Sequence, residues 1–344
     1  TILFALGLLV LATIINFMGT KVLAQAAIIG FTAEIIGALV VGVWLLVAHR
    51  EHNLGIIFDN FGAGGDGNYL WAFAAAALIG IYQYYGFEAC GDVAEEVPNP
   101  GRLIPKAMRR TIYVGGAAAT FVCLALVLAV SDIPAVIAGE ETDPVSTLLN
   151  DAFGTVGARI VLFVVLISFL SCAMSLQAAA SRLAYSYGRD GMIMGSGALK
   201  KFSPTRHVPP YALLLAAAVP AVIVIGSKFS TDAITKIISF AAFGIYLAFQ
   251  MVVFAALRAR LKGWVPSGKY RLGRWALPVN VAALGYGVVA MINMAWPRTP
   301  GAPWFDNWIV ALSAAVVVGI GLVYMTIHPL HDRSTAPYDD AIPR

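Results

Sequence analysis

Long apolar runs alternate with short polar segments along the chain. Nine runs are long enough to cross a hydrocarbon core about 30 Å thick, which takes about 20 apolar residues in a helix. They cover residues 2–18, 26–48, 69–90, 109–131, 157–181, 209–226, 234–257, 276–296 and 307–327. The pattern predicts an all-α integral membrane protein with nine transmembrane helices, with a transmembrane domain at 1–327 and a tail at 328–344. Because the first run starts at Thr1, we expect the domain to be incomplete at its N-terminus.

The basic residues are divided unevenly between the two alternating sets of loops. Of the 23 Lys and Arg residues, 18 fall in the set that includes residues 100–110 and the C-terminal tail, and 5 fall in the other set. Cytoplasmic loops of membrane proteins carry an excess of Lys and Arg. We therefore expect a multi-pass protein of the plasma membrane, with its C-terminus in the cytoplasm.

The composition excludes several classes of protein. Hydrophobic residues make up 59% of the chain, charged residues make up 12%, and the mean hydropathy is +0.79, whereas a soluble domain has about 25% charged residues. So little charge cannot cover a water-facing surface, and a net charge of +4 is not that of a nucleic-acid-binding protein. The three cysteines, Cys90, Cys123 and Cys172, lie in apolar runs without disulfide or metal spacing. We expect no metal and no cofactor.

The third apolar run carries side chains that a lipid-facing helix would not. A charge such as Glu88 costs about 2.5–3.5 kcal/mol at membrane depth unless it is paired or hydrated. Gly86 lets the backbone leave the helix, and non-helical backbone is tolerated at this depth only where it lines a cavity or is covered by protein. We expect a break near Tyr85 and Gly86, whose freed carbonyls bind a cation or ammonium group while nearby tyrosines add cation–π contacts. A helix–helix packing site built on glycines is the alternative.

Three sequence motifs resemble those of amino acid permeases in the amino acid–polyamine–organocation superfamily. The first comprises residues 85–88 (YGFE), 95–100 (EEVPNP) and 104–107 (IPKA), the second residues 181–191 (SRLAYSYGRDG), and a weaker third residues 15–21 (INFMGTK). Their order and spacing match those of the family. The resemblance covers essentially the whole chain.

The resemblance implies a twelve-helix transporter with a five-plus-five inverted repeat and two further helices. The nine helices of this chain would be the fourth to the twelfth. The implied function is secondary active transport of amino acids or related small amines, by alternating access around a broken helix and with H⁺ or Na⁺ as the coupling ion. In the family, the first helix is also broken and supplies the site for the substrate carboxylate, and that helix is absent from this sequence.

The resemblance also implies roles for residues of the third run. Tyr82 matches an aromatic gate that stacks on the bound substrate. Tyr85 and Gly86 match the unwound segment whose carbonyls hold the substrate amine, and Phe87, in the same motif, joins the expected substrate site. Glu88 matches a carboxylate that links the broken helix to its neighbours and can relay protons.

Two further runs carry the expected coupling site. Ser171 and Ser175 lie in the run that matches the eighth helix of the family, where hydroxyls can line the ion site; packing serines are the alternative. Many proton-coupled members carry a Lys in the fifth helix, whereas residues 31–37 here carry Glu34 and no Lys. This departure resembles the choline/γ-aminobutyrate branch of the superfamily. A carboxylate there could carry a proton or coordinate a cation, and a neutral, hydrogen-bonded core glutamate is the alternative.

An intramembrane enzyme and a channel are the competing functions. Hydrolytic chemistry needs a nucleophile with a base, but the five histidines lie in loops or at the ends of runs, and Ser196 stands in a loop between two glycines. Channels need repeated pore-lining rings, usually from several subunits, and one broken helix with bulky aromatic residues does not supply them. The residues therefore favour a transporter that has no catalytic residues and lies in the lipid bilayer.

Overall fold

The chain folds almost entirely into helices. The structure is a computed structural model that describes residues 2–62, 68–141, 143–229, 233–266, 268–298 and 301–328. Within these ranges the one pairing of extended backbone is an isolated bridge between Ser203 and Val208. The longer helices are α1 (Ile2–Phe17), α2 (Thr20–Ala48), α3 (Tyr69–Gln83), α5 (Pro100–Arg110), α6 (Gly116–Ala129), α8 (Pro144–Arg189), α10 (Pro210–Gly226), α11 (Ala233–Leu261), α12 (Ala276–Ala295) and α14 (Ile309–Ile327).

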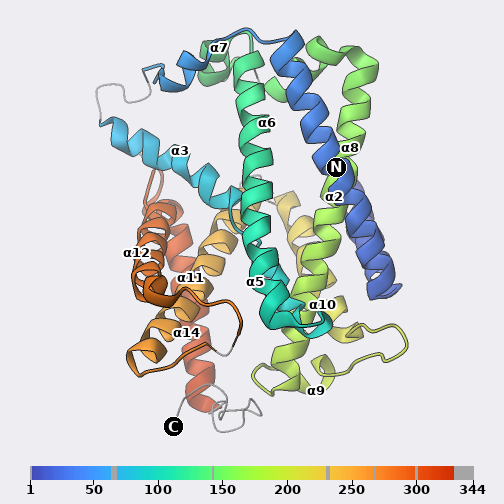
Figure 1. Cartoon of the computed structure of the whole chain (residues 1–344), viewed down its shortest axis with the longest axis vertical. Coiled ribbons are helices and arrows are strands. Elements are labelled where there is room, and N and C mark those ends of the chain that lie inside the picture. The colour runs from blue at the N-terminus through green and yellow to red at the C-terminus, as the bar shows by residue number, and fades with distance from the viewer. Residues whose placement is uncertain are drawn as a thin grey trace.

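Short helical elements connect them. They are η1 (Leu54–Phe58), α4 (Ala89–Asp92), η2 (Ala94–Glu96), the π-helical η3 (Thr111–Gly115), α7 (Ile133–Ala138), α9 (Ser196–Leu199), η4 (Ser227–Phe229), η5 (Gly273–Trp275) and α13 (Trp304–Asn307). Because η3 continues α5 directly into α6, these three elements form one long rod (Figure 1).

The predicted all-α class is confirmed; eight of the nine apolar runs lie mostly in one continuous helical stretch, and the run at 69–90 is divided between α3 and α4. Six helical stretches are long and apolar enough to cross a membrane: 20–48, 100–129, 144–189, 240–261, 273–295 and 309–327. Three further apolar helices, α1, α3 and α10, have 16, 15 and 17 residues. The structure thus supports a multi-pass membrane protein, and the number of nine crossings stays a prediction. The predicted tail lies outside the described residues from 329 onward.

Helix α8 begins well before the apolar run that predicted it. It starts at Pro144, and Gly154 interrupts it with non-helical angles (φ 65°, ψ 172°). Asp143 caps this start by accepting a hydrogen bond from the Ser146 backbone N–H at 3.2 Å, as acidic N-cap residues commonly do. Hydrogen bonds from the Ser146 hydroxyl and backbone hold the pKa of Asp143 below its usual range. Polar capping therefore sets the start of the segment before Gly154, while the apolar run at 157–181 lies within the helical segment that follows Gly154.

Two groups of helices form separate cores. Helix α8 packs against α1, α2 and α10, while α11 packs against α12 and α14 and α3 packs against α12 (Figure 1). Glycines let α2 approach its neighbours: a Cβ on Gly30 would lie 2.2 Å from the Cβ of Ser171, and one on Gly42 would overlap the Phe121 ring. Such small-residue contacts are typical of helix packing in membranes. Many large apolar side chains face outward from both groups, as a lipid environment allows.

Candidate functional site

The third apolar run breaks where the sequence predicts. Helix α3 ends at Gln83, Gly86 has φ +99°, and α4 starts at Ala89. A side chain at Gly86 would meet nothing within 4 Å, so the requirement for glycine comes from the positive φ alone. The predicted break at Tyr85 and Gly86 is confirmed.

The break leaves a row of backbone carbonyls without partners. Among the described residues, no hydrogen bond reaches the carbonyls of residues 82–85. The freed Gly86 N–H, by contrast, donates to Oε2 of Glu88 at 2.8 Å. The Glu88 carboxylate thus caps the donor side of the break, and the acceptor side stays open. In membrane transporters, unwound backbone carbonyls of broken helices can coordinate cations.

Aromatic side chains from three helices surround the break. The rings of Tyr82 and Tyr85 meet edge to face with centroids 6.4 Å apart. Both pack against a buried cluster made of α3, α11 and α12, namely Ile81, Ala242, Tyr246, Ala290 and Met294. Phe87 contacts Phe249 of α11 with centroids 5.2 Å apart. The ring of Phe249 in turn contacts the ring of Tyr246, with centroids 5.7 Å apart. The ring of Tyr246 contacts that of Tyr286, with centroids 6.4 Å apart.

Helices α11 and α12 therefore contribute residues that the sequence reasoning missed. They are Tyr246, Phe249 and Tyr286. The sequence predicts only transmembrane helices for the two apolar runs that contain them. A signal was present, since Phe243, Tyr246 and Phe249 recur at three-residue spacing on one helix. Nothing in that local pattern showed that the stripe would meet Phe87.

Two further carboxylates and a thiol lie near the break or near α2. Glu88 interacts electrostatically with Tyr85, with Asp92 and with Tyr246. The Cys172 side chain on α8 interacts with Tyr85 on one side and with Glu34 of α2 on the other. Glu34 is exposed and makes no hydrogen bond or ion pair within the described part of the chain. Cys172 of α8 thus lies near both Glu34 and Tyr85, but no hydrogen bond or ion pair joins Glu34 to the break among the described residues.

The two serines of the predicted ion site lie on α8. Ser171 is 8% exposed and packs against Gly30, as described above. The Ser175 hydroxyl donates to the Ser171 carbonyl at 2.9 Å, a hydrogen bond within the helix. Both geometries suit packing, and ion binding at these hydroxyls stays a prediction.

Ion pairs join the first and second sequence motifs. Glu96, at the end of η2, accepts a hydrogen bond from Nε of Arg182 at 2.7 Å, and the Arg182 side chain is only 8% exposed. Arg189 donates to both carboxylate oxygens of Glu95 at 2.8 Å and to Asp190 at 3.0 Å. These pairs fasten the segment after the break to the end of α8.

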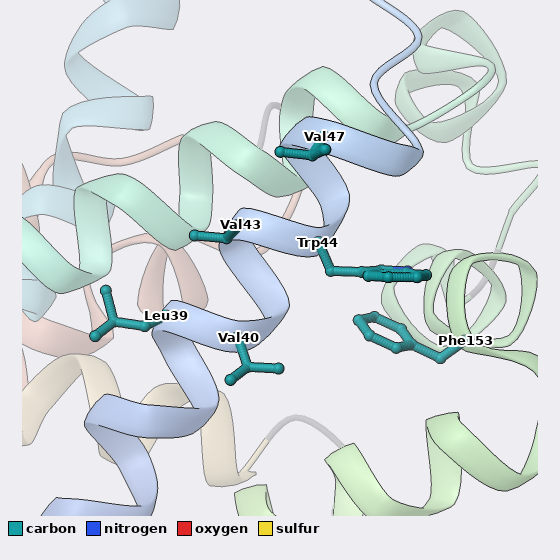
Figure 2. Close-up of a pocket in the computed structure, with 6 residues that line it drawn as sticks. All are labelled: Leu39, Val40, Val43, Trp44, Val47 and Phe153. Carbon is teal, nitrogen blue, oxygen red and sulfur yellow. The ribbon is translucent and has the colours of Figure 1, made fainter.

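An apolar hollow of about 600 Å³ lies elsewhere, between α2 and the start of α8 (Figure 2). Figure 2 shows the rings of Trp44 and Phe153 facing each other, with aliphatic side chains of α2 beside them. The Trp44 indole N–H already donates to the Ala152 carbonyl at 2.9 Å. Because its walls are apolar and none of the predicted site residues lines it, the hollow does not suit an amine.

Comparison with known proteins decides the family. The sequence model described as "Amino acid permease" matches residues 1–326. The chain belongs to the amino acid permease family. This membership confirms the resemblance drawn from the three motifs, and it places the permease in a family of transporters rather than of enzymes.

Individual relatives of the permease are distant. It is 24% identical to a putative polyamine transporter of Candida albicans, over 93% of this chain and 59% of the relative. It is 23% identical to the amino-acid permease BAT1 of Arabidopsis thaliana, over 85% of this chain and 58% of that protein. It is 22% identical to the choline transporter of Saccharomyces cerevisiae, over 66% of this chain and 40% of that protein. The chain thus spans at most about three-fifths of the length of these relatives.

Proposed function

We propose that this permease takes part in secondary active transport of amino acids or related small amines, by alternating access around the break at residues 84–88. The observation that carries the proposal is the row of unpartnered carbonyls at residues 82–85. Three or four such oxygens can accept hydrogen bonds from the N–H groups of one ammonium ion. The rings of Tyr82 and Tyr85 flank the same segment and add cation–π attraction of about 0.5–2 kcal/mol.

The arrangement of charge around the break also suits a cationic group. The Glu88 carboxylate is tethered to Gly86 by its hydrogen bond and therefore cannot swing away without freeing that N–H. Phe87, held against Phe249, covers the segment next to it. The names of two relatives refer to polyamines and to choline, which supports amines as the substrate class.

For energy coupling, the proposal assigns H⁺ or Na⁺ to the region between α2 and the break. Accumulation of a substrate needs a second gradient, because binding alone releases no chemical energy. Glu34 and Glu88 are the carboxylates of this region, and Cys172 of α8 lies near both Glu34 and Tyr85. Ser171 and Ser175 add hydroxyl or carbonyl oxygens on α8.

The proposed topology has nine membrane crossings within residues 1–327, equivalent to the fourth to twelfth helices of a five-plus-five inverted repeat with two further helices. The C-terminus lies in the cytoplasm and the membrane is the plasma membrane. The uneven distribution of Lys and Arg supports this orientation, and the family match over residues 1–326 supports the extent of the domain.

Equilibrium binding to the purified chain in lipid nanodiscs tests the proposed site. Radiolabelled putrescine, choline, γ-aminobutyrate and a neutral amino acid should include at least one saturable ligand. Glu88→Gln keeps an oxygen for the Gly86 N–H but removes the charge, and should weaken binding about 10- to 100-fold, since a hydrogen bond to a charged group contributes about 1.5–3 kcal/mol.

Glu140→Gln, at an exposed position outside the site, is the matched control and should leave affinity unchanged. Equal affinity of wild type and Glu88→Gln for every ligand would show that the amine does not bind at the break. Uptake into vesicles, measured with and without imposed H⁺ and Na⁺ gradients, then identifies the coupling ion.

A further inference from the structure

A stripe of basic residues runs along one exposed face of α5. Arg102, Lys106 and Arg109 follow one another at intervals of four and three residues, which places them on one side of a helix. All three are exposed. The other side of α5 is turned inward, where Met108 approaches Gly91 of α4. Helix α5 therefore presents these three charges outward, while Ile104 and Met108 are partly buried.

The segment before α12 extends this stripe. Gly101 at the start of α5 lies next to Gly268, and the Arg109 guanidinium lies 4.7 Å from the centre of the Tyr270 ring. This segment adds three exposed basic residues, Lys269, Arg271 and Arg274. We call these six residues the α5 basic patch; they are Arg102, Lys106, Arg109, Lys269, Arg271 and Arg274.

Among the described residues, acidic side chains do not neutralise the α5 basic patch. The sequence has no Asp or Glu at residues 97–131 or 233–305. The nearest acidic pair along the chain, Glu95 and Glu96, is already bound to Arg189 and Arg182. None of the six patch residues makes an ion pair within the part of the chain that the structure describes. The charge is therefore available to a ligand.

The position of the patch indicates which ligand it meets. It lies at the start of the rod of α5 and α6 and in the segment just before α12 (Figure 1). Exposed Tyr270 and Trp275 stand among the basic residues, and such aromatic side chains are enriched at the level of lipid headgroups. Clusters of four to eight Lys and Arg at the end of a transmembrane helix bind anionic lipids, at about 1 kcal/mol for each basic residue.

We propose that the α5 basic patch binds the headgroups of anionic phospholipids in the adjoining leaflet. The guanidinium and ammonium groups pair with the phosphate and carboxylate of a headgroup such as phosphatidylserine, while Tyr270 and Trp275 lie at the boundary of the acyl chains. This binding is independent of the amine site, because no residue of the patch takes part in the break.

Titration of lipid into the purified full chain in a neutral detergent tests this proposal. Native mass spectrometry should show phosphatidylserine bound at least tenfold more tightly than phosphatidylcholine. The triple variant Arg102→Gln/Lys106→Gln/Arg109→Gln should lose that preference. Lys200→Gln/Lys201→Gln/Arg206→Gln removes three exposed basic residues from another segment and should retain it.

Two further arms make the result decisive. Inorganic phosphate and soluble glycerophosphoserine serve as competitors. They should displace little lipid if the patch binds the headgroup at the membrane boundary. Displacement of the lipid at equal concentration would show that the patch binds a soluble anion and would overturn the proposal. Wild type alone supplies a test that needs no variant, because 0.5 M NaCl screens exposed charges and should abolish the preference for phosphatidylserine. A preference that survives this salt, or that survives in the α5 triple variant, would also overturn it.

Discussion

The two halves of the broken helix are held in place by different kinds of contact. The first half, α3, packs through rings and apolar side chains: Trp71 stacks on Trp296 with centroids 5.3 Å apart, and the Asn293 amide donates to the Ala74 carbonyl at 2.7 Å. The second half, α4 with η2, is fastened to α8 by charge, through Glu96 and Glu95. One half thus belongs to the group of α11 and α12, and the other belongs to the group of α8.

This difference indicates where the broken helix can bend. Gly86 lies between the two attachments, with positive φ and with open space around its Cα. Apolar contacts are insensitive to salt, whereas ion pairs respond to charge and ionic strength. The two attachments can therefore be weakened separately, and each of the following predictions acts on one of them or on the joint between them.

Breaking the buried ion pair should have the largest effect. Glu96→Gln leaves the Arg182 charge, which is 8% exposed, without its partner. Removing one member of a buried pair costs about 3–5 kcal/mol, and we expect a value near 3 kcal/mol because Glu96 itself is 38% exposed. The free energy of unfolding, measured by denaturation in detergent, checks this.

A native cysteine reports whether the second half is released at the same time. Cys90 lies in α4, so its rate of labelling by a maleimide should rise in Glu96→Gln when Cys123 and Cys172 are replaced by Ala. The reversed pair Glu96→Arg/Arg182→Glu should bring the rate back toward that of the wild type. An unchanged labelling rate in Glu96→Gln would show that α4 does not depend on this pair.

Substitution of Gly86 should change the free energy of unfolding by an intermediate amount, and the sign of the change is informative. Gly86→Ala introduces a side chain at φ +99°, which costs about 1–2 kcal/mol. Gly80→Ala is a matched control, because an added Cβ there also meets nothing within 4 Å but the residue is helical. Ala is better than Gly in a helix by about 1 kcal/mol, so this change should stabilise the protein. Changes of the same sign in both variants would contradict a conformational role for Gly86.

The break itself was predictable because its signal is local: a glycine, three tyrosines and a glutamate interrupt an apolar run. The helix boundaries were less predictable, because hydrophobicity marks where a helix meets lipid and not where its backbone hydrogen bonds end. The run at 69–90 therefore contains all of α3, the break and the first two residues of α4.

Partners across the chain could not be predicted at all. Arg182 and Glu96 are 86 residues apart, and both occurred in recognised motifs, yet nothing in either motif specifies the other. The stripe of Tyr246 and Phe249 likewise became part of the site only through packing of α11 against Phe87. Such contacts arise from the tertiary arrangement, which one sequence does not display.

Removing the ring stack of the first half should have a smaller effect that salt does not change. Trp71→Leu keeps an apolar side chain but loses the stacking on Trp296, and aromatic pairs contribute about 0.5–1.5 kcal/mol beyond burial. We expect a loss near 1 kcal/mol at both 0.1 M and 0.5 M NaCl. Trp304→Leu removes an exposed ring that contacts its chain neighbour Phe305 and should change less. A loss that disappears at high salt would mean that charge also holds this half.

Breaking the outer ion pair should have the smallest effect. Glu95 and Arg189 have side chains that are 62% and 42% exposed, and exposed pairs contribute about 0.2–1 kcal/mol. Glu95→Gln should therefore lower the free energy of unfolding by at most about 0.5 kcal/mol at low salt, and by nothing measurable at 0.5 M NaCl. Because Glu95 and Glu96 are neighbours in sequence and bind the same helix, a large difference between their variants isolates burial as the cause. Similar losses in the two variants would instead show that α8 holds the second half through net charge, with no special role for the buried Arg182.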